Sequence, residues 1–408
     1  MNSSVFEKNR KKILASMDDN SILLAFSHQL NESKYEVNRN YFYLCGVIEY
    51  ENIVLLSKIN GKQNEMIFIN PYDEFKAKWV GAPLSVDDVL NISGIANVYY
   101  LDNFENMLSN LLNTVSTLYV DFKKNPLNSI LNNEEVFANK IKEKMPWVNV
   151  KNADALFKCA RTCKSKEEVE QVSKAIDITN KGIQAILKNI GPMYEYQLES
   201  YFDQAIKFNG STNYAFTTIA ASGSNACCLH YSSNNSMAKD GDLILFDLGA
   251  SYNMYNADIS RTFPISGKFT ERQKQIYNIV LEGQEVVFNN IKPGITTREL
   301  NSILVKFYAN KLKEIGLITN DNEVSKYYYH GVSHHLGLET HDNCEYAPLK
   351  PGCIISNEPG LYIAEEGIGI RIEDDILVTE DGAINLSKDI IKTVEEIEEF
   401  IAKCKESK

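Results

Sequence analysis

A buried strand that carries a carboxylate near its end constrains this chain more than any other feature. The run Asp242–Leu248, DLILFDL, is apolar apart from its first residue and Asp247, and Gly249 follows it. A carboxylate at the end of a buried run is costly unless it is paired or bound to a metal. Asp258 follows in YNADISRTF, and a hairpin with Ser251-Tyr252-Asn253 as its turn would bring both carboxylates onto one face. The fold must therefore compensate these two charges.

Two further carboxylates stand where the local sequence fixes their direction. Pro359 and Gly360 bias Glu358 toward an extended conformation followed by a tight turn. In GIGIRIEDD, strand alternation puts Arg371, Glu373 and Asp375 on one face. Arg371 is then placed to orient Glu373 or a neighbour. Taken singly, each of these carboxylates would ordinarily be an N-cap, a surface turn or part of a charged strand.

Histidines gather in the same half of the chain. Five of the six lie after residue 225, namely His230, His330, His334, His335 and His341. The segment HGVSHH lacks the glutamate of H-E-x-x-H zinc proteases. One imidazole and four carboxylates suit two hard divalent ions better than a structural zinc; these residues are His334, Asp247, Asp258, Glu358 and Glu373. Such a pair activates a water and clamps both reacting oxygens, so the sequence predicts a two-metal hydrolase.

Composition excludes several other classes of protein. The chain has 408 residues and a net charge of −12, which argues against nucleic acid as a partner. No run approaches the ~20 apolar residues of a membrane span. The N-terminus does not have the pattern of a signal peptide, which predicts a cytoplasmic protein. The eight cysteines include no C-x-x-C pair, so we expect reduced thiols rather than a zinc ribbon.

Periodicity predicts two domains, 1–157 and 158–408. Alternating strands and helices favour an α/β first domain; the expected strands are 21–26, 52–56, 65–69 and 118–120, and the helices 104–115 and 133–144. The second begins at a capping box, Ser165 to Glu168, which opens a long helix. Four helices and several short strands should complete an α+β domain; the helices are 196–208, one that starts after 270 and ends before 292, 297–315 and 394–405, and the strands 214–220, 242–248, 354–355, 361–363, 368–372 and 375–378.

Over nearly its whole length the chain resembles the M24B peptidases, the aminopeptidase P and prolidase group with the pita-bread fold. The resemblance rests on four C-terminal motifs, Asp247-x-Gly249-x5-Tyr255-x2-Asp258-x2-Arg261, His330-Gly-x-Ser-His334 with His341-Asp342, Glu358-Pro-Gly-Leu-Tyr362, and Arg371-Ile-Glu373-Asp-Asp375. Residues 1 to about 155 resemble the creatinase-type N-terminal domain, with the best local match at 38–46.

The resemblance implies a role for each matching residue. Asp247 would hold one metal and His334 the other, with Asp258 and Glu373 bridging them. Glu358 would bind a metal and help to deprotonate the attacking water, giving a bridging hydroxide. His230 would line the pocket, His330 and His341 would contact the substrate and stabilise the tetrahedral intermediate, and Arg371 would join them in binding substrate.

The family also implies the metals, the substrate and the assembly. The two divalent ions would be manganese, with cobalt or zinc as alternatives. The substrate would be a peptide with proline second. Tyr362 and Tyr231 could form apolar walls for the proline ring, or either could simply belong to the core. A homodimer or a tetramer is expected. An aminopeptidase acting before proline is the first choice; a prolidase, a non-catalytic pita-bread binding protein and a methionine aminopeptidase are the alternatives.

Overall fold

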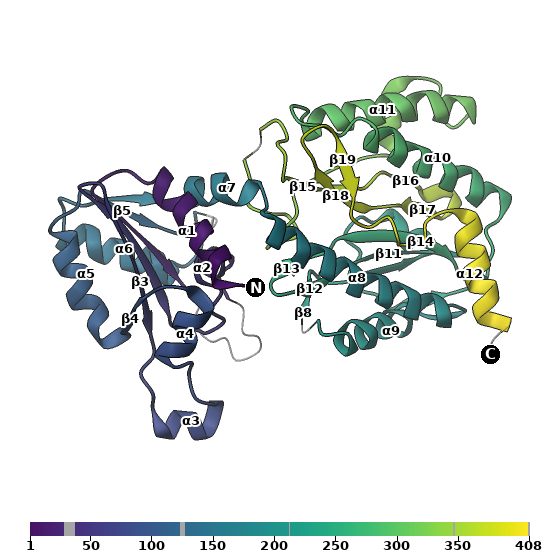
Figure 1. Cartoon of the computed structure of the whole chain (residues 1–408). Coiled ribbons are helices and arrows are strands. Elements are labelled where there is room, and N and C mark those ends of the chain that lie inside the picture. Colours follow the sequence, from purple (N-terminus) through teal and green to yellow (C-terminus); the bar gives the residue numbers. More distant parts are fainter. Residues whose placement is uncertain (28–36, 123–126, 212, 346, 407–408) are drawn as a thin grey trace. The chain divides into compact units, whose positions relative to one another are not determined.

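The computed structural model describes residues 1–27, 37–122, 127–211, 213–345 and 347–406. The chain divides into two compact units, Met1–Arg161 and Thr162–Lys408 (Figure 1). In the described part of the chain, no helix is both long enough and apolar enough to cross a membrane. All eight cysteines are free thiols, as their spacing predicted.

A six-stranded sheet of order β4-β3-β2-β1-β5-β6 forms the centre of the first unit (Figure 1). Pairs β1–β2 and β2–β3 are antiparallel, and the other three pairs are parallel. The predicted strands are confirmed as β1, β2, β3 and β5, while β4 and β6 were not predicted. The strands are β1 (Ser21–Phe26), β2 (Ile53–Ile59), β3 (Lys62–Ile69), β4 (Asn97–Tyr100), β5 (Thr117–Val120) and β6 (Asn149–Asn152).

Helices complete the α/β architecture of this unit. The predicted α5 and α6 are confirmed, and they pack Leu108, Leu112 and Ile141 against sheet residues such as Leu24 and Leu118. The sequence did not predict α1, which opens the chain and buries Ile13 and Leu14. The helices are α1 (Ser3–Ser16), α2 (Arg39–Cys45), α3 (Glu74–Val80), α4 (Val86–Ser93), α5 (Phe104–Leu112), α6 (Asn133–Lys144) and α7 (Asp154–Thr162).

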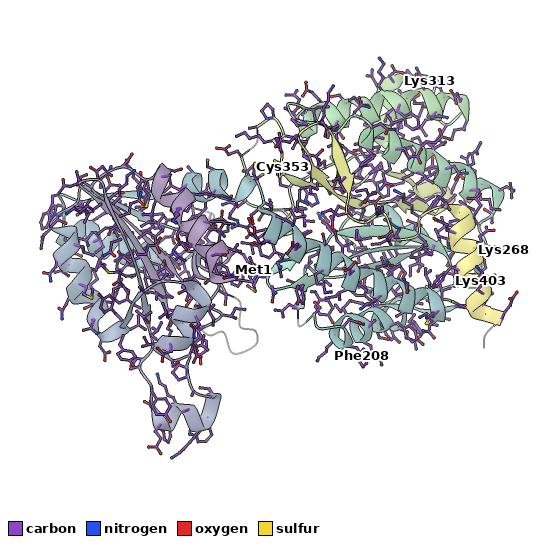
Figure 2. The ribbon with its side chains drawn as sticks, viewed as in Figure 1. Met1, Phe208, Lys268, Lys313, Cys353 and Lys403 are labelled. Carbon is purple, nitrogen blue, oxygen red and sulfur yellow. The ribbon has the colours of Figure 1, made fainter. Side chains whose placement is uncertain are left out.

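Five helices surround the strands of the second unit, and all five were predicted. The capping box at α8 is present, with Ser165 and Glu168 satisfying each other's backbone N–H groups. Exposed lysines such as Lys268, Lys313 and Lys403 lie at its periphery, whereas Cys353 is buried (Figure 2). The helices are α8 (Lys166–Asn189), α9 (Glu195–Phe208), α10 (Glu271–Phe288), α11 (Thr297–Glu314) and α12 (Val394–Glu406).

Short antiparallel strands form the inside of this unit, which confirms the predicted α+β class. The main groups have the orders β14-β11-β9, β13-β12-β8, β15-β18-β19 and β16-β17, and β10 pairs with β7. The strands are β7 (Met193–Tyr194), β8 (Asn213–Tyr214), β9 (Ile219–Ser222), β10 (Met237–Ala238), β11 (Leu243–Leu248), β12 (Ala250–Tyr252), β13 (Tyr255–Asn256), β14 (Ile259–Pro264), β15 (Ile354–Asn357), β16 (Gly360–Ile363), β17 (Ile368–Arg371), β18 (Asp374–Val378) and β19 (Ala383–Asn385).

The hairpin after β11 differs from its prediction in one detail. Ser251 and Tyr252 belong to β12, and the turn lies at Asn253 and Met254, whose φ angles are +47° and +70°. Asp247 therefore pairs with Ser260 across the ladder and not with Asp258. A side chain at Gly249 would place its Cβ 1.9 Å from Ala257 O, so only glycine allows the chains to pass this closely. The strand predicted over 214–220 is likewise split, into β8 and β9.

Candidate metal centre and substrate cavity

A cavity of about 570 Å³ lies within the second unit, and all nine predicted site residues line it. They come from strand ends, from the junctions between strands and from the irregular segments that carry the histidines. The nine are Asp247, Asp258, His334, Glu358, Glu373, His230, His330, His341 and Arg371. Segments far apart in the sequence are thus brought to a single space.

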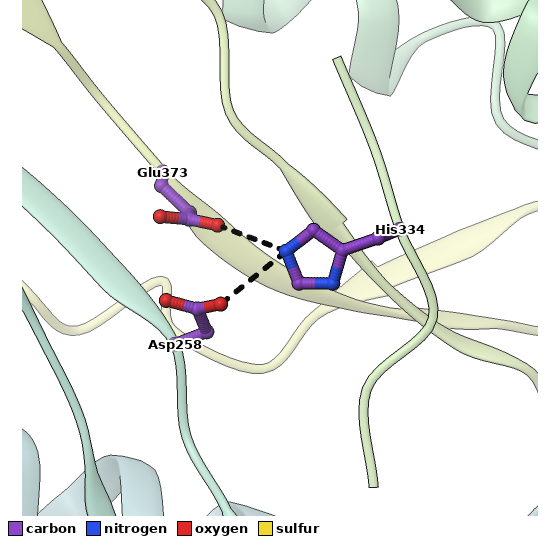
Figure 3. A group of neighbouring side chains, drawn as sticks. All are labelled: Asp258, His334 and Glu373. Carbon is purple, nitrogen blue, oxygen red and sulfur yellow. Dashed lines mark ion pairs between the residues drawn. The ribbon is translucent and has the colours of Figure 1, made fainter. Parts of the chain in front are cut away.

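Asp258, His334 and Glu373 form the centre of this group (Figure 3). Each offers a ligand atom, and these atoms lie within 4.8 Å of one another. The Nε2 atom of His334 lies 3.3 Å from Asp258 Oδ2, 3.5 Å from Glu358 Oε1 and 3.9 Å from Glu373 Oε1. Because His334 Nδ1 is 3.2 Å from His335 O and donates to it, Nε2 is the nitrogen that faces the carboxylates.

These carboxylates are short of positive charge. Burial, the charge of Asp247 and the charge of Glu358 raise the pKa of Asp258 to about 7, although His334 opposes the shift. Burial, reinforced by Asp258, raises the pKa of Glu373 well above its usual value. Burial lowers the pKa of His334, but its hydrogen bond to Asp258 and the charge of Glu358 outweigh burial and raise it to about 9. Divalent cations would supply the missing charge, so the donor set fits a metal pair.

Arg371 and Ser260 connect the ligands to one another. Arg371 Nη2 lies 2.7 Å from Asp247 Oδ2, and its Nε donates to Ser260 Oγ at 2.7 Å. Ser260 Oγ lies in turn 2.8 Å from Glu373 Oε2. Arg371 therefore reaches Glu373 through Ser260, a residue that the sequence analysis missed. Alternation along β14 places Ser260 on the face of Asp258, and this pattern could have revealed it.

The two tyrosines predicted as apolar walls have other contacts. Neither Tyr362 nor Tyr231 lines the cavity, whose apolar wall is formed by Phe216, Ile219 and Leu229. The Tyr362 hydroxyl accepts from Arg371 Nη1 at 3.1 Å, and that of Tyr231 donates to Glu195 Oε2 at 2.8 Å. Tyr362 belongs to a hydrophobic cluster with Ile219, and Tyr231 packs against that cluster, so the alternative that the rings belong to the core is confirmed.

Two histidines around the ligands, His330 and His341, are neutral at pH 7. Burial, aided by the charge of Arg371, lowers the pKa of His330 to about 4. Its Nδ1 donates to Gly331 O at 2.8 Å, so its Nε2 accepts the Tyr362 hydroxyl, also at 2.8 Å. Burial and the charge of His334 lower the pKa of His341, whose ring centre lies 4.2 Å from that of His334. His230 is exposed at the cavity.

Asp374 follows Glu373 at the start of β18, and its carboxylate has different partners. Its Oδ1 lies 2.7 Å from Arg261 Nη2 and its Oδ2 lies 2.6 Å from Lys392 Nζ. Burial alone would raise the pKa of Asp374, but these two cations hold it below its ordinary value. Asp374 is a paired buried carboxylate, in contrast to the group inside the cavity.

Known proteins are similar to this chain over nearly its whole length. The model of metallopeptidase family M24 matches residues 170–380, and that of the aminopeptidase P N-terminal domain matches 6–119. The Xaa-Pro aminopeptidase of Escherichia coli is 31% identical, and the match covers 96% of each chain. A solved structure from Bacillus anthracis assigned to aminopeptidase P has a TM-score of 0.96 and 44% identity over 99% of each chain. The E. coli aminopeptidase P solved with the inhibitor Pro-Leu has a TM-score of 0.90 and 29% identity, with 100% of this chain and 99% of that chain covered.

These matches agree with the predicted fold and the predicted enzyme class. The M24 match spans all five predicted metal ligands, and the second match lies within the first unit. The chain therefore belongs to metallopeptidase family M24, in its Xaa-Pro aminopeptidase group.

Proposed function

We propose that the protein uses two divalent metal ions to release the N-terminal residue from peptides with proline in second position. The observation that carries this proposal is the convergence of all nine predicted residues on one cavity. The cavity combines a charge-poor carboxylate cluster with an apolar wall, which suits a substrate that is polar at the scissile bond and apolar beside it. We assign this catalysis to the predicted domain 158–408.

The proposed metal ligands are Asp247, Asp258, His334, Glu358 and Glu373, with Asp258 and Glu373 as bridges. Four carboxylates and one imidazole favour manganese, since oxygen-rich sites select hard ions; cobalt and zinc are the alternatives. When bound, such a pair of ions lowers the pKa of a water and polarises the scissile carbonyl. Ser260 and Arg371 would keep the ligands oriented through their hydrogen bonds to Glu373 and Asp247.

Glu358 is the proposed proton acceptor. Burial raises the pKa of its carboxyl, against the opposing charges of His334 and Arg371. Its carboxylate lines the cavity beside the other proposed ligands, where it could take a proton from the attacking water. Glu358 Oε2 lies 3.8 Å from His330 Nδ1, which places the carboxylate beside the proposed substrate shell.

The neutral histidines would bind and orient the peptide. His330 and His341 are neutral and so add no positive charge next to the substrate; His341 can donate a hydrogen bond, whereas the N–H of His330 is engaged by Gly331 O. We propose that they contact the substrate at the scissile bond and stabilise the tetrahedral intermediate, with His230 lining the pocket and Arg371 contributing a fixed charge. The wall formed by Phe216, Ile219 and Leu229 would receive the proline ring.

The test is cleavage of a synthetic Xaa-Pro peptide of several residues, assayed with manganese, cobalt and zinc and accompanied by elemental analysis. We expect release of the first residue and two metal ions per chain. The dipeptide Gly-Pro is assayed in parallel to test the main alternative, a prolidase. Cleavage of the dipeptide alone would identify a prolidase. Absence of both metal and cleavage would favour a non-catalytic binding protein.

Compartment and assembly belong to the same proposal. We propose a cytoplasmic enzyme, because eight free cysteines suit a reducing compartment. We also propose a homodimer or a tetramer. Sedimentation equilibrium of the purified protein measures its assembly, and a monomeric mass would contradict this part of the proposal.

A further inference from the structure

The segment between β9 and β10 forms one side of the substrate cavity. It begins with a short 3-10 helix, Gly223–Cys227, and then belongs to no helix or strand until β10. The side chains of Leu229, His230 and Ser232 line the cavity. A side chain on an irregular segment keeps one position only if contacts from neighbouring elements hold it there. The shape of this side of the cavity therefore depends on what holds the segment in place.

Glu195, the first residue of α9, holds the segment with its buried carboxylate. Its Oε1 accepts from the backbone N–H and the hydroxyl of Ser222, both at 2.7 Å, and from Asn225 Nδ2 at 3.0 Å. Its Oε2 accepts from the Tyr231 hydroxyl at 2.8 Å and from Ser236 N at 2.9 Å. Hydrogen bonds to a carboxylate are stronger than those between neutral groups. A single side chain thus connects the beginning, the middle and the end of the segment.

The position of Glu195 is itself fixed by α9. The backbone N–H of Glu195 donates to Ser236 O at 3.0 Å, and β7, directly before α9, pairs with β10, directly after the segment. α9 also packs closely against α8, since a Cβ added at Gly182 would lie 2.3 Å from Phe202 Cδ2. Glu195 is therefore part of a closely packed helix pair and can serve as a fixed point for the irregular segment.

The same segment contributes to the apolar side of the cavity. Leu229 and Tyr231 pack against a buried cluster that includes Ile219 and Tyr362. Ile219 also lines the cavity, together with Leu229 and Phe216. Because the hydroxyl of Tyr231 is bonded to Glu195 and its ring packs beside Leu229, a displacement of Tyr231 must also change the apolar wall.

We propose that Glu195 is a positioning residue that sets the preference for proline by holding Leu229 and His230 at the cavity. This inference rests on the proposed function, which places the proline ring against the apolar wall. Glu195 is not among the described residues that line the cavity, so it acts through the segment and not on the substrate. The proposed metal ligands lie on other segments. The effect of Glu195 should therefore fall on substrate selection and not on metal binding.

The first experiment uses Glu195→Gln, which keeps the size of the side chain but replaces one acceptor oxygen with a donor. Whichever way the amide turns, its NH2 group faces a backbone N–H, that of Ser222 or that of Ser236, and two donors cannot bond. Steady-state kinetics on matched Xaa-Pro and Xaa-Ala peptides measures the ratio of their kcat/KM values. We expect this ratio to fall by about 10-fold, as for the loss of an apolar contact to the substrate, with a raised KM for the Xaa-Pro peptide. Both metal ions should remain, and loss of metal or an equal loss on both peptides would overturn the inference.

Glu168→Gln is the matched control. Glu168 is also a buried glutamate in the first turn of a helix, and it accepts from the backbone N–H of Ser165 and from the hydroxyl of Tyr255. Glu168→Gln should lower the melting temperature and leave the preference for proline unchanged. If the control lost as much preference as Glu195→Gln, the effect would be one of general destabilisation and the proposal would be wrong.

The second experiment tests whether Glu195 acts through the apolar wall. Glu195→Gln is combined with Leu229→Ala, and we expect little further loss of proline preference, because the side chain that Glu195 positions is already absent. A further loss as large as that in the wild-type background would contradict the proposal.

If Glu195→Gln does not fold, Tyr231→Phe carries the same test, because it removes one hydrogen bond to Glu195 and keeps the ring. The proline preference should then fall by about 3-fold, and an unchanged preference would refute the positioning role. Wild-type protein that cleaves no Xaa-Pro peptide would refute the proposed function instead.

Discussion

Glu373 and Asp374 are neighbours in the chain, both fully buried, yet they face opposite electrostatic environments. Glu373 shares its side of the strand with Asp258 and Glu358, and its pKa lies well above the usual value, first because of burial and then because of these charges. Asp374 faces Arg261 and Lys392, which hold its pKa below the usual value despite burial. One peptide bond separates a cluster with fewer cations than carboxylates from one in which a single carboxylate has two cations.

This difference shows how a ligand site can be told from a structural ion pair. The Asp374 cluster is complete within the protein, so it stabilises the fold and needs no other partner. The Glu373 cluster is incomplete, and its unfavourable charges can be balanced only by protons or by bound cations. Function is expected on the incomplete side and stability on the complete side.

The largest expected effect comes from removing a charge on the incomplete side. Asp258→Ala and Glu373→Ala should each lower kcat by more than about 100-fold, which is the upper range for residues that only orient a metal ligand. Both variants should remain folded, because each removes one of several repelling charges. Steady-state kinetics and far-UV circular dichroism measure the two properties. Full activity in either variant would refute the metal site.

A charge removed on the complete side should instead reduce stability. Asp374→Asn leaves Arg261 and Lys392 without their buried partner and should cost about 3–5 kcal/mol of unfolding free energy. Urea denaturation measures this loss, and metal content at low temperature should stay at the wild-type level. Glu399→Gln, which removes an exposed pair with Lys403, is the control and should leave stability unchanged. If Asp374→Asn and Glu399→Gln were equally stable, this result would contradict the conclusion that the Asp374 cluster stabilises the fold.

Metal removal should make stability depend on pH in a defined direction. The folded pKa of His334 is about 9, above its unfolded value, so its stabilising charge is fully present below about pH 6.5 and is lost as pH rises through 9. Glu373, whose folded pKa is also raised, contributes in the same direction. The opposite contributions of His330 and His335, whose folded pKa values are about 4, are complete by pH 6.5.

Chelated protein should therefore become less stable between pH 6.5 and 9, as measured by thermal melting. Saturating manganese should remove most of this dependence, because the cations take the place of the protons. At one hundred times its dissociation constant, the metal should add about 2.7 kcal/mol of stability. If chelated protein became more stable from pH 6.5 to 9, this result would contradict the conclusion that the carboxylates of the cavity lack compensating positive charge.

Ser260→Ala should have the smallest of these effects. It removes the hydroxyl that lies between Arg371 and Glu373, without changing any charge. The loss of a buried hydrogen bond of this kind costs about 1 kcal/mol, so we expect an approximately 5- to 10-fold fall in kcat with both metals retained. Ser266→Ala, at a half-buried serine in the turn after β14, is the control. A loss as large as that of Asp258→Ala would show that Ser260 touches the reacting atoms.

Local patterns together with the family resemblance were enough to predict nine of the residues that line the cavity and most of the second unit. Asp247 and Glu373 lie at strand ends, and Pro and Gly follow Glu358. In each case the neighbouring residues restrict the backbone, so the direction of the side chain can be predicted from the local sequence. The capping box of α8 predicted where this helix begins. In the first unit, the strands with continuous apolar runs were predicted, whereas the short and partly exposed β4 and β6 were not.

What could not be predicted depends on partners that are distant in the sequence. Lys164 meets Asp342, and Asp374 meets Lys392, only after the strands and helices have packed. Tyr362 was predicted as an apolar wall because its ring is visible in the sequence, whereas its contacts with His330 and Arg371 are not. The turn at Asn253 and Met254 was misplaced because Ser251 has strand partners on both sides and Tyr252 pairs with Tyr255.

The scatter of the proposed ligands along the chain has a consequence for the order of events during synthesis. They span positions 247 to 373, and the last of them lies between β17 and β18. A growing chain cannot present the full set until nearly the whole second unit has emerged and its distant strands have paired, which is a slow step. Metal binding should therefore occur late in folding. A protein that contains both metal ions would then be one whose folding is complete.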